Sequence, residues 1–304
     1  MSSSELPITL GREHLAMRVQ SLGQLLEEAI PFKQVHLRAE SEPLPNQLWR
    51  KMEEAGWLDI EMFHPVNLAA VSVALGQQGL PAHCGEHLLA SYVLGVPSRD
   101  DRLCLAVVPR TSTGRLLVRF AAWSQRAVII EKDQALAFPL RSRSPLRTTA
   151  GEGWQWVGVR GDFSTSQPAN GLVTEGLLQL SRGAEVYGIL QRLYTLTRDY
   201  VRQREQFGRP IGSFQAVQHK IADMIIGLVV AESLLVGAIV DGDHQVARAA
   251  RLSVDSAAQK IASDAVQLHG ALGFSSEHPV ALLYRRAQML KLGHEQRERL
   301  LSFM

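Results

Sequence analysis

Cysteine and charge imbalance are the two features that this sequence lacks most plainly. Its 304 residues include only two cysteines, Cys84 and Cys104, which is too few for a disulfide framework and fits a reducing compartment. Lys and Arg number 32 against 30 Asp and Glu, so the charge predicts neither a nucleic acid nor an anionic membrane as partner. His83, Cys84 and His87 would supply three metal ligands without a fourth, a pattern more typical of helix positions than of a zinc site. We therefore expect no metal.

The sequence also lacks an evident targeting segment and an uninterrupted membrane-spanning run. The opening, MSSSELPITL, has no basic start and no long apolar stretch, so it does not predict a signal peptide. The apolar segment 225–240 is interrupted by Glu232 and Ser233, so it does not predict a transmembrane helix. We expect a cytoplasmic protein without a membrane partner.

The hydrophobic pattern changes twice along a chain that is long enough for two or three domains. Apolar residues recur at helical spacing up to about residue 96, short runs rich in Val, Leu and Ile follow, and helical spacing then returns. This predicts a mainly α protein with a small central β-domain: a helical domain (1–97), a β-domain (98–170) and a four-helix bundle (171–304). We expect strands at 103–108, 115–121, 126–130 and 154–159, and bundle helices at 172–206, 214–241, 246–268 and 279–303.

Residues 200–224, YVRQREQFGRPIGSFQAVQHKIADM, predict two helices joined by a tight loop. Arg202 and Arg204 place positive charge in the last turn of the first helix, where it suits the macrodipole. Gly208 is expected in the left-handed conformation that ends a helix, and Pro210 prevents continuation. We expect Ser213 to cap the second helix, whose apolar face carries residues at spacings of three and four: Phe214, Val217, Ile221, Met224 and Leu228.

The motif R-x-x-F-G followed by P-I-x-x-F-Q-A-V-Q-H-x-I-A-D-M in this stretch resembles the signature of the acyl-CoA dehydrogenase family. In that family the hairpin reaches across a subunit interface to a flavin. The resemblance implies that Arg204 pairs with the FAD pyrophosphate, that Phe207 packs near the flavin or adenosine, and that Gln215 hydrogen-bonds the cofactor. These residue types suit those roles, because a guanidinium matches phosphate oxygens in two contacts and an aromatic ring gives a flat apolar wall.

Two further segments extend the resemblance. QLHGALGFSSEHP, at 267–279, is similar to the family pattern Q-x-x-G-G-x-G-Y/F-x-x-E-x-P, in which glycines let the backbone approach the cofactor. Gln267, Gly270 and Gly273 match, whereas Ala271 replaces the second glycine of the pair; the alternative is a helix cap and loop without a cofactor role. LWRKMEEAGWLDI, at 48–60, resembles the family's N-terminal helical domain.

The central region departs from the family. It is shortened, and it contains neither the T-E-x-x-x-G-S-D stretch nor the W-I-T or W-I-S stretch that hold the flavin ring in family members. We interpret Trp123, Ser124 and Trp154 as packing residues rather than substitutes for those motifs.

The catalytic glutamate of the family is also missing from its usual positions. It ends the motif R-D-A-x-x-x-x-I-x-E-G-T, and the corresponding run here, from Arg285, places His294 at that point. Glu295 follows one residue later, about 100° further around a helix. The family's alternative position falls on Leu178, with Glu175 nearly a turn away. The candidates for a base are therefore His294, whose ordinary pKa lies near neutrality, and Glu295; the alternative for His294 is a surface position in the run HEQRER.

The resemblance implies an FAD-dependent α,β-dehydrogenation of an acyl-CoA thioester in a homo-oligomer or hetero-oligomer, with electron-transfer flavoprotein as an acceptor. Some bacterial members, notably those acting on steroid side chains, are heteromers in which one subunit lacks the base but lends its hairpin to the flavin site of a homologous subunit. The chain is accordingly a dehydrogenase, a non-catalytic partner subunit, or a flavin-free scaffold with the same fold.

Overall fold

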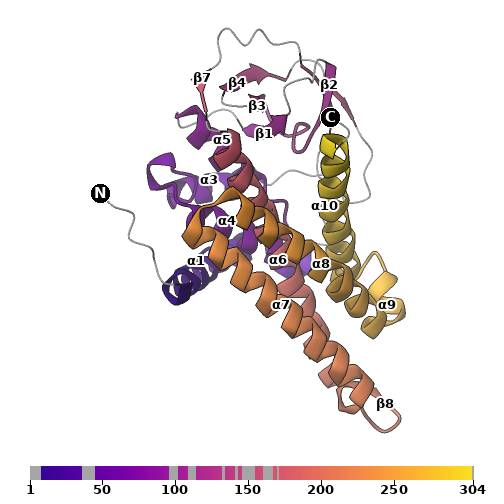
Figure 1. Cartoon of the computed structure of the whole chain (residues 1–304). Helices are drawn as coiled ribbons and strands as arrows, with labels where there is room; N and C mark the ends of the chain where they lie inside the picture. The colour runs from indigo at the N-terminus through magenta and orange to yellow at the C-terminus, as the bar shows by residue number, and fades with distance from the viewer. Residues whose placement is uncertain are drawn as a thin grey trace.

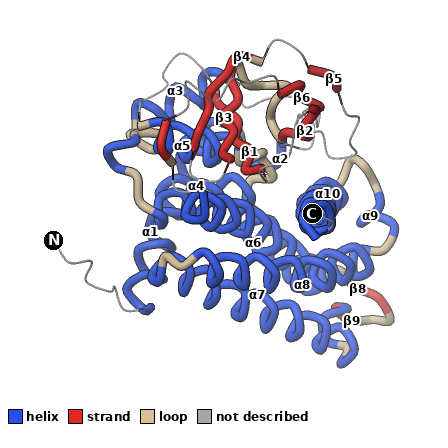
Figure 2. Tube along the Cα trace, turned by 45° about the horizontal axis from the view of Figure 1, so that its top comes forward, coloured by secondary structure: helices blue, strands red, loops and turns tan. Residues whose placement is uncertain are grey.

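The computed structural model describes residues 8–35, 45–95, 102–108, 114–131, 134–140, 143–145, 155–159, 167–169 and 171–302. Within these ranges the chain is mainly helical with a small β region between two helical parts, as expected. Figure 2 shows the layers. The strands cover α5. Helices α4 and α6 lie beneath them, and α8 and α7 form the opposite side. The predicted fold class is confirmed, and the exact domain boundaries stay a prediction.

The N-terminal helical part is built around α4, which is apolar on all sides and buried along almost its whole length. His64 caps its first turn and Pro65 occupies the first helical position, a place that proline tolerates. The helices of this part are α1 (Ile8–Ala29), α2 (Phe32–Val35), α3 (Asn46–Glu54), η1 (Ile60–Met62), α4 (Pro65–Gln77) and α5 (His83–Leu94).

Helix α4 packs directly on the long helix α6 (Gly171–Gln203) because glycines open both surfaces. A Cβ added at Gly76 would lie 2.2 Å from the carbonyl oxygen of Glu185, and one added at Gly188 would lie 2.1 Å from that of Val73. Any side chain at either glycine would force the two helices apart. This close crossing joins the N-terminal part to the bundle.

The β region forms two small sheets. The first has the order β1-β3-β4-β7, with β1 parallel to β3, and the second has the order β2-β6-β5 with antiparallel pairs. The second expected strand was too long, because it ends at Val118 and a turn follows. Strands β4, β5 and β7 were not anticipated. The strands are β1 (Leu103–Val108), β2 (Gly114–Val118), β3 (Arg126–Glu131), β4 (Gln134–Pro139), β5 (Arg143–Pro145), β6 (Gln155–Val159) and β7 (Gln167–Pro168).

The bundle consists of α6, α7 (Gln215–Asp241), α8 (His244–His269) and α10 (Pro279–Ser302), with the short α9 (Ala271–Phe274) before α10. Met224 and Leu228 of the expected apolar face of α7 are buried in its core. Helix α8 begins two residues earlier than predicted, because the Asp243 side chain caps its first turn. By length and composition α7 is also apolar enough to cross a membrane, although core helices of soluble proteins meet the same criterion.

The loop between α6 and α7 differs from the prediction in its form. Helix α6 ends at Gln203, and β8 (Glu205–Gln206) and β9 (Arg209–Pro210) make a tight β-hairpin whose two central residues, Phe207 and Gly208, have φ values of 54° and 75°. Gly208 is therefore left-handed as expected, but it serves the hairpin turn rather than the helix end.

Ser213 is not the N-cap of α7. It ends the 3-10 turn η3 (Ile211–Ser213), its hydroxyl donates to the carbonyl oxygen of Pro210 at 2.7 Å, and Phe214 occupies the cap position without a side-chain hydrogen bond. The hairpin lies at the end of the molecule opposite the sheets (Figure 1).

Candidate functional site

The hairpin is held rigidly at its base and projects at its tip. The amide of Arg204 donates to the carbonyl oxygen of Tyr200, and the amide of Ile211 donates to that of Arg204, both at 2.8 Å. The Arg209 guanidinium lies 4.3 Å from the centre of the Phe214 ring. Phe207 touches the same ring edge-on at 6.1 Å, yet it is 91% exposed. A large aromatic side chain is thus displayed to solvent by an ordered support.

The backbone of Phe207 adds to the case that this display has a purpose. Its φ of 54° is left-handed, a conformation that costs a non-glycine residue about 1–2 kcal/mol. The exposed ring recovers little of that cost by packing within the chain. Strain of this kind is concentrated at functional sites.

The structure brings the predicted cofactor residues to one end of the bundle. Gln215 is the exposed first residue of α7, and Gln267 and Gly270 lie exposed at the end of α8. The Tyr200 and His269 rings stack at 4.4 Å, and Lys220 forms an ion pair with Asp264. These contacts join the hairpin side of the site to the turn between α8 and α9.

Three exposed arginines at this end make no ion pair with the described part of the chain. Within the described part of the chain, no acidic group lies within ion-pair distance of Arg202, Arg204 or Arg209. Sequence reasoning named only Arg204 as a ligand; its sequence neighbours Arg202 and Arg209 were the available signal. Unpaired guanidinium groups beside an aromatic ring suit a ligand that carries phosphates and a planar ring.

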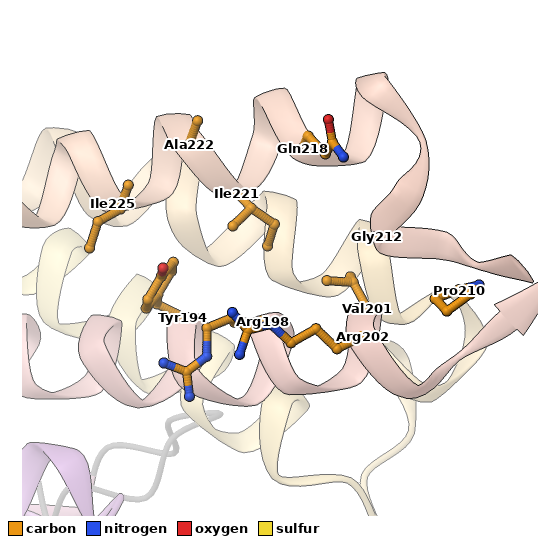
Figure 3. A pocket seen from close by; sticks show the side chains of 10 residues that line it. All are labelled: Tyr194, Arg198, Val201, Arg202, Pro210, Gly212, Gln218, Ile221, Ala222 and Ile225. Atoms are coloured by element: carbon orange, nitrogen blue, oxygen red, sulfur yellow. The ribbon is translucent and has the colours of Figure 1, made fainter.

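A groove of about 500 Å³ adjoins the hairpin between α6 and α7 (Figure 3). The α6 wall carries Tyr194, Arg198 and Arg202, and the α7 wall carries Gln218 and apolar side chains. The groove contains none of the five predicted cofactor residues, so it is a neighbour of the candidate site rather than its centre. Its remaining lining residues are Val201, Pro210, Gly212, Ile221, Ala222 and Ile225.

Comparisons with known proteins find similarity in sequence for the C-terminal part of the chain and similarity in fold for nearly all of it. The profile described as acyl-CoA dehydrogenase, C-terminal domain, matches residues 173–299. This chain has the fold of acyl-CoA dehydrogenases, and residues 173–299 resemble the C-terminal domain of that family. The acyl-CoA dehydrogenase IpdE2 of Mycobacterium tuberculosis is 37% identical over 123 residues, which is 39% of each chain. The 3-sulfinopropanoyl-CoA desulfinase of Paraburkholderia xenovorans is 38% identical over 109 residues, or 34% of this chain and 28% of that protein.

The similarity in structure extends further than the similarity in sequence. A chain of the ChsE4-ChsE5 complex from Mycobacterium tuberculosis superposes with a TM-score of 0.79 at 21% identity, covering 100% of both chains. A glutaryl-coenzyme A dehydrogenase superposes with a TM-score of 0.74 at 18% identity, covering 91% of this chain and 90% of that chain. The aligned sequence spans only about two fifths of the curated relative IpdE2. For the rest of this chain, the similarity to solved structures establishes the fold. The recognised resemblance is confirmed.

The glycines of the acyl-CoA dehydrogenase pattern have different roles here. Gly270 has φ 61° and ψ −133°, a conformation that essentially requires glycine. A Cβ added at Gly273 would lie 2.5 Å from the carbonyl oxygen of Val266, so that position also excludes a side chain. Ala271, which replaces the family's second glycine, is the exposed first residue of α9. Its methyl group therefore stands on the surface that a cofactor would approach.

The candidate base remains a prediction. His294 and Glu295 lie on α10, but their side chains are outside the described residues. The alternative position, Leu178, is 1% exposed, and the nearby carboxylate of Glu175 accepts a hydrogen bond from Gln179 at 2.6 Å. The described part of α6 thus places an apolar side chain, rather than an acid, at the family's second position.

The junction of the three regions contains a buried network of charges. Arg119, in the turn after β2, donates from both Nη atoms to the Glu185 carboxylate of α6, at 2.8 and 2.9 Å. Arg286 of α10 donates to the carbonyl oxygen of Gly79 at 2.7 Å and lies 3.4 Å from Glu185. Glu86 of α5 lies 3.0 Å from Arg182. The network therefore joins both helical parts to the β region.

Pairing keeps the central carboxylate ionised. Burial by itself would raise the pKa of Glu185, but the charges and hydrogen bonds of Arg119, with Arg286, lower it below the ordinary value. A carboxylate held in two contacts by an arginine is a poor proton acceptor. Domain junctions are common ligand sites, but these paired side chains occupy this one, and their role is structural.

Two smaller predictions concern α5 and its neighbours. His83, Cys84 and His87 are buried, and His83 Nε2 contacts the carbonyl oxygen of Leu103 at 3.1 Å and the Ser124 hydroxyl at 3.0 Å. Trp123 stacks on Phe120 at 5.6 Å, which agrees with a packing role. Trp154 lies outside the described residues.

The bundle end fits one part of FAD. The unpaired guanidinium groups and the exposed amide side chains of Gln215 and Gln267 match the phosphates and polar edges of its adenosine diphosphate, and Phe207 offers a flat wall. All of these groups face solvent, so the described residues leave this end of the bundle open.

Proposed function

We propose that this chain is a subunit of an FAD-dependent acyl-CoA dehydrogenase and supplies its bundle end to a flavin site completed by a homologous chain. The observation that carries the proposal is the projecting hairpin, in which a strained Phe207 is 91% exposed beside unpaired arginines. Apart from its edge-on contact with Phe214, the exposed ring gains little within the described part of the chain. It becomes useful when a second chain brings a cofactor against it.

Each side chain at this end has a defined task in the proposal. Arg204 binds the FAD pyrophosphate with its guanidinium, Phe207 packs against a planar ring, and Gln215 and Gln267 hydrogen-bond polar edges. The left-handed Gly270 allows the backbone to approach the same ligand. FAD, when bound, supplies the acceptor for the hydride removed from the β-carbon of an acyl-CoA thioester.

An exposed apolar face on α7 supports the proposal that a partner chain binds here. Ile226 is 60% exposed, and apolar neighbours continue the face along the helix. Contiguous apolar surface of this kind marks protein interfaces. Exposed apolar side chains on this face include Ile226, Val229, Val230 and Leu234.

The named relatives favour a homologous rather than an identical partner. ChsE4-ChsE5 is described as a complex, and Tcur3481-Tcur3483 is described as a steroid acyl-CoA dehydrogenase, and both share this fold. The missing glutamate and the shortened β-domain point the same way, since a partner supplying both would complete the site. We accordingly propose acyl-CoA thioesters, including those of steroid side chains, as substrates, and electron-transfer flavoprotein as acceptor.

Flavin content tests the proposal directly. The chain is purified alone and after co-expression with a neighbouring dehydrogenase homologue, and visible flavin absorbance is measured together with subunit stoichiometry. The proposal expects flavin only in the complex, at about one FAD per pair of chains. About one FAD per lone chain indicates instead a homo-oligomeric enzyme and makes His294 and Glu295 the next residues to change. Absence of flavin in both samples favours the scaffold.

The Arg204→Ala variant tests the hairpin itself. Loss of a charge-assisted contact to phosphate lowers affinity about tenfold or more, because such contacts contribute about 1.5–3 kcal/mol. FAD affinity is measured by fluorescence titration of the flavin-free complex. Arg50→Ala is the matched control, since Arg50 is an exposed arginine on α3 in the other helical part. Equal affinities for both variants would remove Arg204 from the site.

A further inference from the structure

The proposed flavin-binding residues are divided between two separate elements. Arg204 and Phe207 lie on the hairpin that follows α6, whereas Gln267 and Gly270 lie on the turn that follows α8. One ligand can contact both only if the distance between hairpin and turn is fixed. The contacts that fix this distance, the Tyr200–His269 stack and the Lys220–Asp264 ion pair, have no part in the proposed function so far.

Tyr200 connects to the hairpin through the backbone. Its carbonyl oxygen accepts the amide of Arg204 at 2.8 Å, so the Tyr200 position sets where the hairpin begins. Its ring stacks on the ring of His269 with 4.4 Å between centres and 23° between planes. Tyr200 is half-buried.

His269 connects to the turn in the same way. It is the last residue of α8, directly before Gly270, and is only 4% exposed. Its Nδ1–H donates to the carbonyl oxygen of Ala265 at 2.8 Å, because that oxygen can only accept, and this bond fixes the orientation of the ring. His278 lies against it at 5.2 Å and 52°. The stack therefore ends within one residue of Gly270.

A second contact ties the end of α8 to α7, the helix on the other side of the hairpin. Lys220, in the second turn of α7, forms an ion pair with Asp264, which lies three residues before Gln267. Asp264 also accepts from Lys260 at 3.1 Å. The turn is thus tied to both helices that flank the hairpin.

We infer that Tyr200 and His269 are positioning residues whose stacked rings set the separation between hairpin and turn, so that both elements hold one FAD molecule. The inference rests on the proposed function, because it concerns the same ligand. Neither ring contacts the ligand in this role. Their effect passes through the backbone of Arg204 on one side and of Gly270 on the other.

FAD affinity of the flavin-free complex gives the first test. Tyr200→Leu removes the ring and lowers affinity about five- to tenfold, the range expected for loss of one aromatic pair. Tyr200→Phe keeps the ring and the stack, so its affinity stays close to that of the unchanged complex. His269→Gln removes the ring on the other side of the stack, and we expect it to lower FAD affinity by a similar factor to Tyr200→Leu.

A distance measurement tests the geometry without FAD. Spin labels are placed on Gln206→Cys in the hairpin and Leu272→Cys in α9, both exposed positions, and the native Cys84 and Cys104 are buried. The labelled complex gives one narrow distance distribution. Tyr200→Leu and His269→Gln broaden it, whereas Tyr200→Phe does not.

The results separate this inference from the proposed function. Weaker FAD binding and a broader distance in Tyr200→Leu, with rescue by Tyr200→Phe, support it. If Arg204→Ala weakens binding while Tyr200→Leu and His269→Gln change neither affinity nor distance, the inference is overturned and the proposed function stands. If Arg204→Ala also has no effect, Arg204 is removed from the site and the inference, which depends on it, is overturned. If the unchanged complex binds no FAD, both the inference and the proposed function are overturned.

Discussion

Arginine has opposite roles at the junction of the three regions and at the hairpin end of the bundle. At the junction, Arg119 is 1% exposed and donates two hydrogen bonds to Glu185. At the bundle end, Arg202, Arg204 and Arg209 are exposed and lie beyond ion-pair distance of every described acidic group. Residue type alone therefore does not indicate a ligand site; an arginine is a candidate ligand where it is exposed and makes no ion pair.

The junction also shows why a buried charge network is not a reserve of stability. Removing Arg119 and Glu185 from water is costly, and their two short hydrogen bonds serve mainly to offset that cost. What such a pair does provide is a strict geometric requirement, because the energy is favourable only when both partners are in place. It therefore specifies how the β region meets the two helical parts.

Breaking the junction gives the largest expected effect. Arg119→Met leaves Glu185 buried without its main partner and lowers the free energy of unfolding by about 3–5 kcal/mol. Urea unfolding of the purified chain measures it. The double variant Arg119→Met/Glu185→Leu recovers part of the loss, because it removes both charges, and Arg204→Ala leaves the stability within about 0.5 kcal/mol. A loss for Arg204→Ala equal to that for Arg119→Met would contradict the division between the two regions.

The sequence predicted the architecture because its large patterns are local. Helical spacing located the bundle helices within a few residues, and Gly270 with Gln267 located the turn after α8. The hairpin form was missed, since Phe207 at φ 54° is an unusual residue for such a turn and no propensity rule favours it there. Propensity argued for a helix end at Gly208, and strand pairing of only two residues on each side prevailed.

The buried network was beyond sequence reasoning for a different reason. Arg119, Glu185 and Arg286 are far apart in the chain, and nothing near any of them marks it as buried. Only the fold brings them together. The same holds for the Tyr200–His269 stack, which joins residues from α6 and α8. The identity of the base was not recovered from either source, because the His294 and Glu295 side chains lie outside the described residues.

The second largest expected effect is a loss of folding stability at acidic pH, caused by buried groups on the junction side of the molecule. Burial, with the nearby His87, lowers the pKa of His83 well below 6.5, so folded His83 is neutral. The unfolded chain takes up this proton below its ordinary pKa and the folded chain does not, so stability falls by about 1.4 kcal/mol per pH unit as the pH drops below 6.5. Glu185, whose folded pKa is lowered, adds a further loss below the ordinary glutamate value of 4.5.

Urea unfolding of the chain between pH 7 and pH 5 measures the histidine contribution. His83→Gln flattens the profile in this interval, because the amide can still donate to the Leu103 carbonyl but does not titrate. The His269 pKa is also lowered, by burial, so His269→Gln gives the corresponding profile for the bundle end. A profile for His83→Gln that still falls as steeply as that of the unchanged chain would show that other groups control the acid response.

The smallest expected effect on the free energy of unfolding is at the bundle end, where a substitution raises stability instead of lowering it. Asn accepts a left-handed backbone more readily than Phe, so Phe207→Asn raises the free energy of unfolding by about 0.5–1 kcal/mol. Its FAD affinity in the complex falls about fivefold, because the aromatic wall is lost. Met17→Asn, at a 62% exposed helical position with ordinary backbone, lowers stability by about 0.5 kcal/mol and leaves affinity unchanged. A residue whose replacement stabilises the chain but weakens ligand binding serves ligand binding rather than stability. If Phe207→Asn instead destabilises the chain, Phe207 has a structural role like the residues of the junction.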